Sequence, residues 1–326
     1  FGERFATRLI AAYFNKLGLD TQPIDAFKLG LITTSDFGQA HPLPESQPRI
    51  ARALRRIKKL PIITGFIGKD KSGNITTLGR DGSDYTASFI GAALRAREIQ
   101  IWRDIDGIMT ANPRIVPRAR LVKEISLEEA GELARYSSGV FHPYMLTPAI
   151  RHQIPIRILN IFKPRSGTTV VNRSALEGIA KSITYKPHIN LVNLVSPEMF
   201  HHRGMVTKVF DVLGANKIQI DMLASSRISL SLAVANREAK GLKPALKEIS
   251  KFAQINIAPH KAIVCVIGEG IKKVPGIVAK VFTALDKAKI RIEMISHGAT
   301  KTNLTLLVNN SQATQAVRVL HKTIFR

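Results

Sequence analysis

The sequence predicts an α/β protein with a mainly parallel sheet flanked by helices, followed by two smaller domains of ferredoxin-like βαββαβ topology. Segments with helical and with strand periodicity alternate through the first half of the chain. The apolar run LPIITGFIG at 60–68 is typical of a strand buried on both faces of a parallel sheet. Residues 204–222 recur at 276–294, and ten of the 19 aligned residues are identical.

Composition narrows the functional classes. The chain has 326 residues, of which 45% are hydrophobic, and 48 basic against 24 acidic side chains give a formal net charge of +24. This balance favours anionic partners, but the basic residues are dispersed and no nucleic-acid-binding motif is present, so nucleic acid is not an expected partner. No apolar run suits a membrane span, and no secretory signal is visible. The first residue is Phe1, from which we expect a fragment or a processed product.

The elements of the first half are expected in a definite order. Helices are expected at 4–18 and 51–60, the second amphipathic with a solvated basic face and preceded by a Pro-rich loop at 41–48. Strands are expected near 29–33 and at 60–68. A turn at 70–74 leads into a Gly-rich loop and a helix within 75–96, and a strand at 98–102 completes a βαβ unit. Ser126 and Glu129 form a capping-box pattern before a helix over 126–135, and a strand follows at 154–162.

The internal repeat organises the second half. The identical positions, each matching the residue 72 further on, are Gly204, Val206, Lys208, Val209, Phe210, Leu213, Lys217, Ile218, Ile220 and Met222. Each copy is expected to hold a helix after its glycine. Strands are expected at 189–195, 218–223 and 228–234 in one copy and at 261–267, 290–295 and 304–308 in the other, with closing helices within 237–253 and 311–322. Cys265 lies in one of these apolar strands, so we expect a buried thiol in a reducing compartment.

The segment ITTLGRDGSDYTASFIGAALRA, residues 75–96, places Arg80, Ser83 and Asp84 between glycines at the start of a helix. A helix N-terminus presents free N–H groups and a partial positive charge, and glycines let a ligand approach the backbone, so such a site attracts anions. A helix cap from Ser83 or Asp84 accounts for part of the pattern. It does not account for Arg80, whose planar guanidinium suits an acceptor carboxylate that Asp84 would orient or activate.

Long segments of the chain resemble aspartokinases. In the first half they are FGERFATRLIAAYFNKLG, PIITGFIGKDKSGNITTLGRDGSDYTA, IWRDIDGIMTANPRIV and GVFHPYMLTPAIRHQIPIRI. MFHHRGMVTKVFDVLGANKIQIDMLASSRISLSLAV and MISHGATKTNLTLLV look like the two ACT domains of the monofunctional, lysine-sensitive plant and bacterial type. The resemblance implies an amino-acid-kinase-type catalytic domain at 1–173 without its N-terminal segment. ACT domains would follow at 183–258 and 259–326, with strands that can interleave between them.

The resemblance also implies an activity and its residues. The family transfers the γ-phosphoryl group of ATP, held with Mg²⁺, to the side-chain carboxylate of L-aspartate, the first step toward lysine, threonine and methionine. Arg80 and Asp84 would be catalytic, and Glu3, Gly79, Gly82 and Ser83 would join Arg80 in binding the substrate. The nucleotide would lie against Trp102, Arg103, Asp104, Met109, Arg114 and Gly139. No metal ligand among the protein side chains is assigned.

Regulation and location follow from the same resemblance. Lysine, with threonine as a further candidate effector, would bind between the ACT domains of a homodimer. The lysine-site residues would be Met199, Gly204, Met205, Val206, Asp221, Ser225, Ser226 and Ile228. No membrane partner is expected. The plant-like segments suggest the plastid stroma, and a bacterial cytoplasm stays open.

The chain departs from the family pattern at identifiable places. The family's N-terminal Lys-Phe-Gly-Gly-Thr segment, which cradles the phosphates, does not occur in this sequence. Asp81, Arg103, Asn112, Gly139 and Arg227 stand where the family usually has other residues, which bears on ATP affinity and on the response to lysine. The alternatives are therefore a non-catalytic ACT paralogue or regulatory subunit that senses amino acids, and, on charge alone, a nucleic-acid binder.

Overall fold

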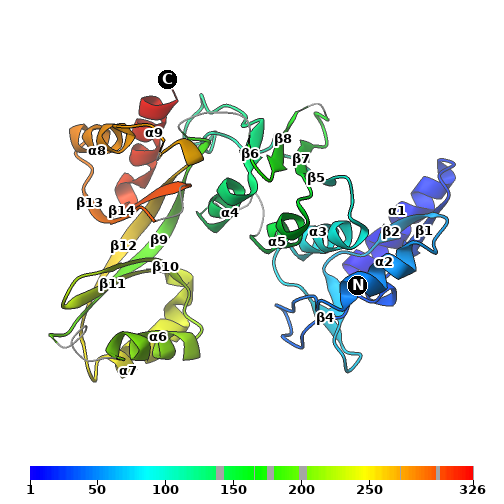
Figure 1. The fold of residues 1–326 in the computed structure, drawn as a ribbon, viewed down its shortest axis with the longest axis horizontal. Coiled ribbons are helices and arrows are strands. Elements are labelled where there is room, and N and C mark those ends of the chain that lie inside the picture. The colour runs from blue at the N-terminus through cyan, green and yellow to red at the C-terminus, as the bar shows by residue number, and fades with distance from the viewer. Residues whose placement is uncertain are drawn as a thin grey trace. The chain divides into compact units, whose positions relative to one another are not determined.

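The chain forms two compact units, and its first half contributes to both of them. The computed structural model describes residues 1–136, 143–164, 166–174, 180–197, 204–271, 273–298 and 302–325. The first unit comprises Phe1–Ile108 and Leu121–Leu176, and the second comprises Met109–Arg120 and Glu177–Arg326. Figure 1 shows the elements of each unit along the chain. Two expected site residues, Gly139 and Met199, lie outside the described residues.

The first unit alternates short strands with helices. Its elements are α1 (Gly2–Lys16), β1 (Thr21–Ile24), a 3₁₀ turn (Ala26–Leu29), α2 (Ser46–Leu54), β2 (Leu60–Ile63), β3 (Ile67–Lys69), β4 (Ile75–Thr77), α3 (Gly82–Leu94), β5 (Ile99–Arg103), β6 (Glu124–Ser126), α4 (Leu127–Tyr136), α5 (Pro143–His152), β7 (Ile156–Asn160) and β8 (Gly167–Val171).

Parallel pairing predominates among these strands. A four-stranded sheet has the order β5-β7-β8-β6, in which β5–β7 and β6–β8 are parallel and β7–β8 is antiparallel. The pair β1–β2 is parallel, and β3–β4 is an antiparallel hairpin. Helix α3 packs against α2 and α5. The expected α/β class, with strands flanked by helices, is confirmed.

Several local expectations were wrong. The run 60–68 is two strands separated at Phe66, which has φ 67°, and Leu60 is 52% exposed, so this run is not buried on both faces. Strand β2 pairs with β1, whereas β5 pairs with β7, so the run and β5 do not form one βαβ sheet. The range 29–33 holds the end of the 3₁₀ turn and isolated bridges at Ile32 and Thr33. The basic helix begins at Ser46, inside the expected loop, and ends at Leu54.

The second unit contains both copies of the repeat. Its elements are β9 (Ser182–Val195), α6 (Met205–Ala215), β10 (Ile220–Ser225), β11 (Ser229–Ala235), a 3₁₀ turn (Asn236–Glu238), α7 (Ala239–Ile249), β12 (Gln254–Ile267), a 3₁₀ turn (Glu269–Ile271), α8 (Ile277–Lys287), β13 (Ile292–Ser296), β14 (Asn303–Asn309), a 3₁₀ turn (Asn310–Gln312) and α9 (Ala313–Ile324).

One antiparallel sheet of order β10-β11-β9-β12-β14-β13 joins the two copies. The 14-residue strands β9 and β12 pair along most of their length. The first half of β12 completes the four-stranded set of the first copy, and the first half of β9 completes that of the second. Each copy therefore has the βαββαβ plan expected of a ferredoxin-like domain, and each completes its sheet with a segment from the strand that opens the other copy.

The repeat extends to the backbone conformation. The residues before α6 and α8, Gly204 and Gly276, both have positive φ, and so do Lys217 and Lys289 just after these helices. Irregular pairing recurs at the equivalent positions of β10 and β13. Conformations that most side chains avoid thus recur 72 residues apart, as expected if the two copies fold in the same way.

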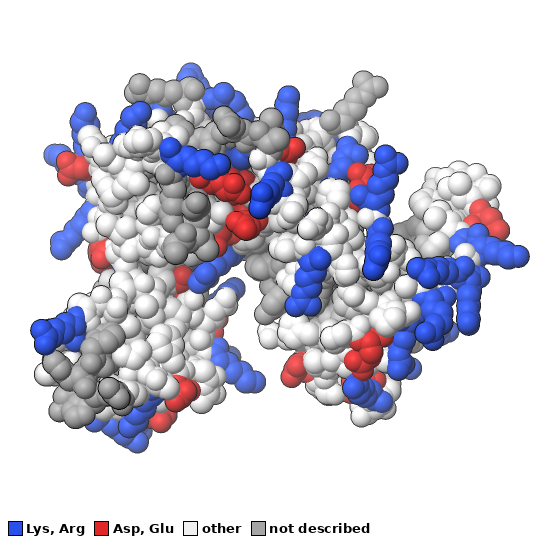
Figure 2. Space-filling model, viewed as in Figure 1, with Lys and Arg blue, Asp and Glu red and all other residues white. Residues whose placement is uncertain are grey.

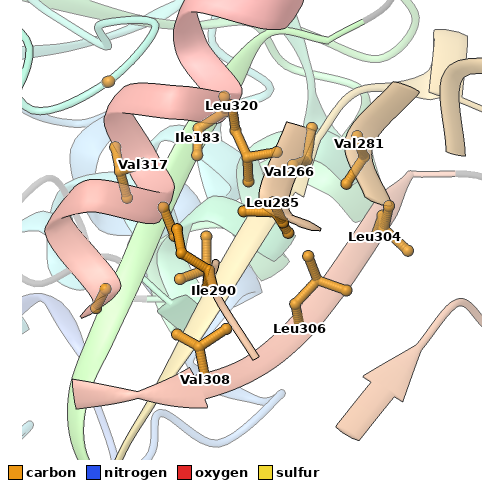
Figure 3. Close-up of a cluster of buried hydrophobic side chains, with 14 of the residues drawn as sticks. Ile183, Val266, Val281, Leu285, Ile290, Leu304, Leu306, Val308, Val317 and Leu320 are labelled. Carbon is orange, nitrogen blue, oxygen red and sulfur yellow. The ribbon is translucent and has the colours of Figure 1, made fainter. Parts of the chain in front are cut away.

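The core of the second copy includes a segment from the first half of the chain. Ile183, Val266, Leu285, Leu306 and Leu320 pack together in the cluster shown in Figure 3. Ala111, Ile115 and Val116, from the segment Met109–Arg120, belong to the same cluster. The Ile183 N–H donates to the Thr110 carbonyl over 2.8 Å, and Arg318 Nε donates to the Ile115 carbonyl over 3.0 Å. Burial and hydrogen bonds together fasten this segment to the second unit.

Charge and polarity are distributed as the composition suggests. Basic side chains appear over the visible surface of both units and outnumber acidic ones (Figure 2). Arg52, Arg55 and Arg56 line a shallow hollow beside α2. Cys265 is fully buried on β12, as expected. None of the helices in the described part of the chain combines the length and apolar character needed to cross a bilayer.

Candidate active site

The mouth of α3 is built by tight backbone packing. Asp81, the N-cap residue, has φ 54°, a left-handed conformation that Asp, Asn and Gly tolerate best. A Cβ on Gly82 would lie 2.8 Å from the Phe66 ring, so only glycine fits there. The Phe66 N–H donates to Thr86 Oγ1 over 3.0 Å, and Thr86 Oγ1 donates to the Gly82 carbonyl over 2.8 Å. These contacts fix the first turn of the helix against the loop that precedes β3.

The side chains at this mouth differ in exposure. The side chain of Arg80 is 72% exposed, and its Nε lies 4.0 Å from Asp81 Oδ2. Ser83 is exposed, whereas the side chain of Asp84 is only 18% exposed. The structure therefore brings four of the expected acceptor residues, Gly79–Arg80 and Gly82–Ser83, to one end of α3 beside Asp84. An exposed guanidinium beside the N-terminus of a helix is an arrangement that can receive a carboxylate or phosphate.

Asp84 is paired with Arg103 at the end of β5. The Arg103 guanidinium donates to Asp84 Oδ2, and the Arg103 side chain is 22% exposed. Burial raises the pKa of Asp84 above its ordinary value, Arg103 opposes this rise through its charge and hydrogen bond, and the nearby Asp81 carboxylate adds to it. Arg103 was expected to face the nucleotide, and in the structure its guanidinium contacts Asp84 at the mouth of α3.

Glu3 lies on a different element of the same unit. It is in the first turn of α1, and its carbonyl accepts a hydrogen bond from Thr7 Oγ1. The neighbouring Arg4 and Arg8 pair with Asp25, whose side chain is fully buried. Burial raises the pKa of Asp25, but the hydrogen bonds and charges of the two arginines outweigh it, so the net shift is downward. Within the described residues, no side-chain hydrogen bond or ion pair joins Glu3 to the mouth of α3.

Polar groups gather where β5 and β7 end. Arg103 and Asn160 are register partners at the last positions of these parallel strands. Asn160 Nδ2 donates to Asp106 Oδ1 over 2.6 Å, and Lys163 Nζ lies 3.4 Å from Asp106 Oδ2. A hollow of about 540 Å³ lies beside them, lined by Leu121, Lys163, Pro164 and Ser166. The carboxyl ends of parallel strands are where α/β sheets bind ligands, so this edge is the candidate nucleotide site.

The expected nucleotide residues divide between the two units. Trp102 and Asp104 are exposed beside Arg103 in the first unit. Met109 and Arg114 lie in the second unit, where Ser182 Oγ donates to the Met109 carbonyl over 2.9 Å. Arg114 is exposed, and its backbone N–H donates to Asn112 Oδ1. The structure thus groups Trp102–Asp104 with the β5–β7 edge of the first unit, whereas Met109 and Arg114 belong to the second unit, which contains the repeats.

Sequence reasoning missed Asp106, Asn160 and Lys163. The available signal was positional. Asn160 closes an apolar strand, and Lys163, three residues later, directly precedes the sequence Pro-Arg-Ser-Gly. Polar residues at the carboxyl end of a predicted parallel strand are candidates for binding. That rule could have singled out Asn160 and Lys163, but the partner Asp106 depends on the pairing of β5 with β7.

The expected effector residues lie on the first repeat. Gly204 is the exposed N-cap of α6, and Met205 and Val206 are partly buried against the core of that copy. Ser225, Ser226 and Ile228 lie around the turn between β10 and β11, all exposed, with Ile228 at 50%. Ser226 and Ser229 share a hydrogen bond of 2.6 Å between their hydroxyls. Arg227, one of the departures from the family pattern, is also exposed in this turn.

Asp221 has an internal cationic partner. It is only 3% exposed, and Lys186 Nζ, from β9, lies 2.7 Å from each of its carboxylate oxygens. The equivalent acid of the second copy, Glu293, receives Lys261 Nζ at 2.6 Å. A buried carboxylate needs such a partner, because an unpaired charge in the interior is costly. An effector ammonium at Asp221 would therefore have to share the carboxylate with Lys186.

No cluster of three or more His, Cys, Asp or Glu side chains suited to a metal occurs in the described part of the chain. Mg²⁺ in phosphoryl-transfer sites is held largely by substrate phosphates and water, with one or two carboxylates. The carboxylates near the two candidate sites, Asp81, Asp84 and Asp106, can supply that number. The donor set is therefore compatible with a magnesium ion that arrives with a nucleotide.

Comparison with protein families assigns both parts of the chain. Residues 1–160 match the amino acid kinase family, and residues 192–249 and 264–324 match an ACT domain. Aspartokinase 3, chloroplastic, from Arabidopsis thaliana is 37% identical over all of this chain, which spans 60% of that protein. The lysine-sensitive aspartokinase 3 of Escherichia coli is 33% identical over 99% of this chain and 74% of its own length.

Solved structures agree with these assignments. The crystal structure of E. coli aspartokinase III in complex with aspartate and ADP, in its R-state, superposes with a TM-score of 0.88 and 32% identity, covering all of this chain and 74% of that one. The same enzyme with lysine and aspartate, in its T-state, gives 0.81 and 33% with the same coverage. The Clostridium acetobutylicum aspartate kinase gives 0.83 and 27%, covering 99% of this chain and 74% of that one.

Proposed function

Because this chain belongs to the aspartokinase family, we propose that it is the larger part of an aspartate kinase. The enzyme would transfer the γ-phosphoryl group of ATP to the side-chain carboxylate of L-aspartate and form 4-phospho-L-aspartate. That product opens the route to lysine, threonine and methionine. The chain spans 60% of the length of the Arabidopsis relative and 74% of that of the E. coli one. The activity of these whole relatives is therefore a proposal for the protein that contains this chain.

The observation that carries the proposal is the meeting of two sites at Asp84 and Arg103. Asp84 stands in the first turn of α3, beside the exposed Arg80, and Arg103 ends β5 at the polar edge of the β5–β7 pair. An anion-binding helix mouth and a strand-end ligand edge are thus adjacent. Transfer between two bound anions needs this adjacency, because positioning and charge neutralisation supply most of the catalysis of phosphoryl transfer.

The residues can be given roles on this basis. A carboxylate acceptor has an ordinary pKa near 3.9, so it is ionised at neutral pH and needs no base to remove a proton. Arg80 would hold a carboxylate of the substrate over the α3 amides, and Glu3 would hold its ammonium group. Trp102, Asp104 and Lys163 would face the nucleotide. Mg²⁺ bound to the phosphates would neutralise part of their charge.

Regulation by lysine is the second part of the proposal. The E. coli structure with lysine supports a lysine site in this family. On this chain the site would be formed by Gly204–Val206, Asp221 and the turn at 225–228, with a second copy of the chain completing it as a homodimer. Threonine is a further candidate effector. The relatives include chloroplastic and bacterial proteins, so the plastid stroma or a bacterial cytoplasm is the inferred location.

Trapping of the acyl phosphate tests the activity. The full-length protein is incubated with ATP, Mg²⁺ and aspartate, and hydroxylamine converts 4-phospho-aspartate to a hydroxamate, which is detected by the colour of its ferric complex. We expect hydroxamate from the unaltered protein, suppression by lysine, and a loss of about 100-fold or more in Asp84→Ala, as when a charged group is removed from a reacting centre. Glu128→Ala, at an exposed acid on α4, is the control and should keep full activity.

The same assay separates the alternative. A full-length protein that binds lysine in calorimetry but forms no hydroxamate would favour a non-catalytic amino-acid sensor built on the ACT pair. A protein that forms hydroxamate with Asp84→Ala unimpaired would leave the enzyme class standing and refute the assignment of its site.

A further inference from the structure

We propose that Arg103 is a positioning residue of the acceptor site, which fixes the Asp84 carboxylate and cancels its charge so that anionic substrates can approach the mouth of α3. This inference rests on the proposed function and adds a residue whose expected role was nucleotide binding alone. It starts from the direct contact between the Arg103 guanidinium and Asp84 Oδ2.

The register between α3 and β5 delivers Arg103 to this place. A Cβ on Gly91 would lie 2.6 Å from Ile99 Cγ1, so the glycine lets the first residue of β5 approach the helix closely. From that point the strand returns alongside the helix. Four strand residues cover about 13 Å and seven helical residues about 10.5 Å, so Arg103 arrives close to Asp84.

Burial makes this ion pair more consequential than a surface one. The side chains of Asp84 and Arg103 are 18% and 22% exposed, so solvent screens their interaction only in part. The charged groups around Asp84 are Arg103 on β5 and Asp81 at the N-cap of α3, with the exposed Arg80 beyond Asp81. Without Arg103, two carboxylates would face any anion that approaches the helix mouth.

That electrostatic balance decides whether an anionic acceptor binds. Aspartate carries two carboxylates and one ammonium group, and its phosphoryl donor is a polyanion. Carboxylates near the helix mouth repel an anionic substrate and oppose its binding. A guanidinium held on Asp84 Oδ2 neutralises the charge of Asp84. A carboxylate can accept several hydrogen bonds, so the contact at Oδ2 leaves Oδ1 able to accept one from the substrate.

The pair also defines what Asp84 does. The acceptor carboxylate is already ionised at neutral pH, so the reaction requires no general base. Asp84 and Arg103 therefore act together as an orienting pair at the boundary between the acceptor and nucleotide sites.

The test uses the full-length protein with Arg103→Met, Arg103→Lys and the control Arg97→Met, which removes an exposed guanidinium from the same α3–β5 connection. Circular dichroism establishes that each variant folds. In Arg103→Met we expect the KM for aspartate to rise about 10- to 100-fold, the range for a lost charged hydrogen bond, with a smaller change in the KM for ATP. Arg103→Lys should recover a large part of the loss, and the control should match the unaltered protein.

A second readout does not depend on activity. In protein whose aspartate residues are labelled with ¹³C, an NMR pH titration should show a higher pKa for Asp84 in Arg103→Met than in the unaltered protein, because burial and Asp81 then act without opposition. The acid limb of the kcat/KM profile should move to higher pH with it. Aspartate binding measured by calorimetry should be partly restored in the double variant Asp84→Asn/Arg103→Met, which removes both charges.

The outcomes separate the two proposals. If the unaltered full-length protein forms no acyl phosphate, the proposed function fails, and the titration of Asp84 still decides whether Arg103 controls its charge. An unchanged Asp84 titration, or an Arg103→Met variant that alters only the KM for ATP, would overturn the positioning role while leaving the kinase assignment intact.

Discussion

Asp81 shows how a residue can look anomalous in the sequence and reasonable in the structure. It is one of the positions at which the chain departs from the family pattern. Its φ of 54° suits an aspartate, because Gly, Asn and Asp are the residues that accept left-handed backbone most readily. An aspartate also occurs in other backbone conformations, so its presence at position 81 did not predict a positive φ.

Arg103 illustrates a different limit at the same scale. Its position after an apolar strand was predicted, and so was its place near the nucleotide segment. The contact with Asp84, 19 residues earlier, depends on how closely α3 packs on β5 at Gly91. Local patterns give each element but not the register between two elements, so the pair emerged only from the fold.

His321 is expected to make the second unit sensitive to acid. It is 5% exposed, and its Nε2 lies 2.9 Å from Thr110 Oγ1. Burial, and then the charge of Arg120, lowers the pKa of His321. The folded-state pKa is below the unfolded value near 6.5, so the neutral ring stabilises the fold at higher pH, and this stability declines as pH falls below about 6.5.

Urea unfolding at pH 7.5 and pH 5.5 checks this dependence. We expect His321→Gln to be less stable than the unaltered protein at pH 7.5 and to lose less of its stability on acidification. Each unit of displaced pKa corresponds to about 1.4 kcal/mol. His152→Gln, at an exposed position on α5, is the control. If the free energy of unfolding depends on pH equally in His321→Gln and in the unaltered protein, His321 is not the cause of the acid sensitivity.

Among the elements, the ones specified by local chemistry were predicted best. The capping box at Ser126 is formed as expected: the Ser126 N–H donates to Glu129 Oε2 over 2.9 Å, and the Glu129 N–H donates to Ser126 Oγ over 3.2 Å. Helix α4 begins directly after it, at Leu127. The predicted strand at 60–68 failed because the left-handed conformation of Phe66 divides it, and because Leu60 in β2 stays 52% exposed.

The cap provides a prediction at this scale. Ser126→Ala should destabilise α4 by about 1 kcal/mol, the usual effect of a lost N-cap. Native-state hydrogen exchange of the α4 amides should then be about five times faster, provided that they exchange by local opening. Ser72→Ala, in the exposed turn before β4, should leave these amides unchanged. Protection of α4 that is the same in Ser126→Ala would show that tertiary packing alone holds the start of this helix.

For the whole molecule, the repeat was the most informative feature of the sequence. Identity at an offset of 72 residues predicted two βαββαβ copies, and the structure contains both. The sharing of β9 and β12 was not determined by the repeat, because either copy could have completed its own sheet. The inclusion of Met109–Arg120 in the second unit was also not visible, since its apolar residues Ile115 and Val116 suit any core.

The central claim is that this fold carries phosphoryl transfer to a side-chain carboxylate, and an isotope measurement tests it most directly. The full-length protein is given ATP, Mg²⁺ and aspartate labelled with ¹⁸O in both side-chain carboxylate oxygens, and hydroxylamine cleaves the acyl phosphate at its carbonyl carbon. Phosphate released in this way should carry one ¹⁸O from the bridging position. Phosphate without label would mean that water, not the aspartate side chain, accepts the phosphoryl group, and would contradict the account.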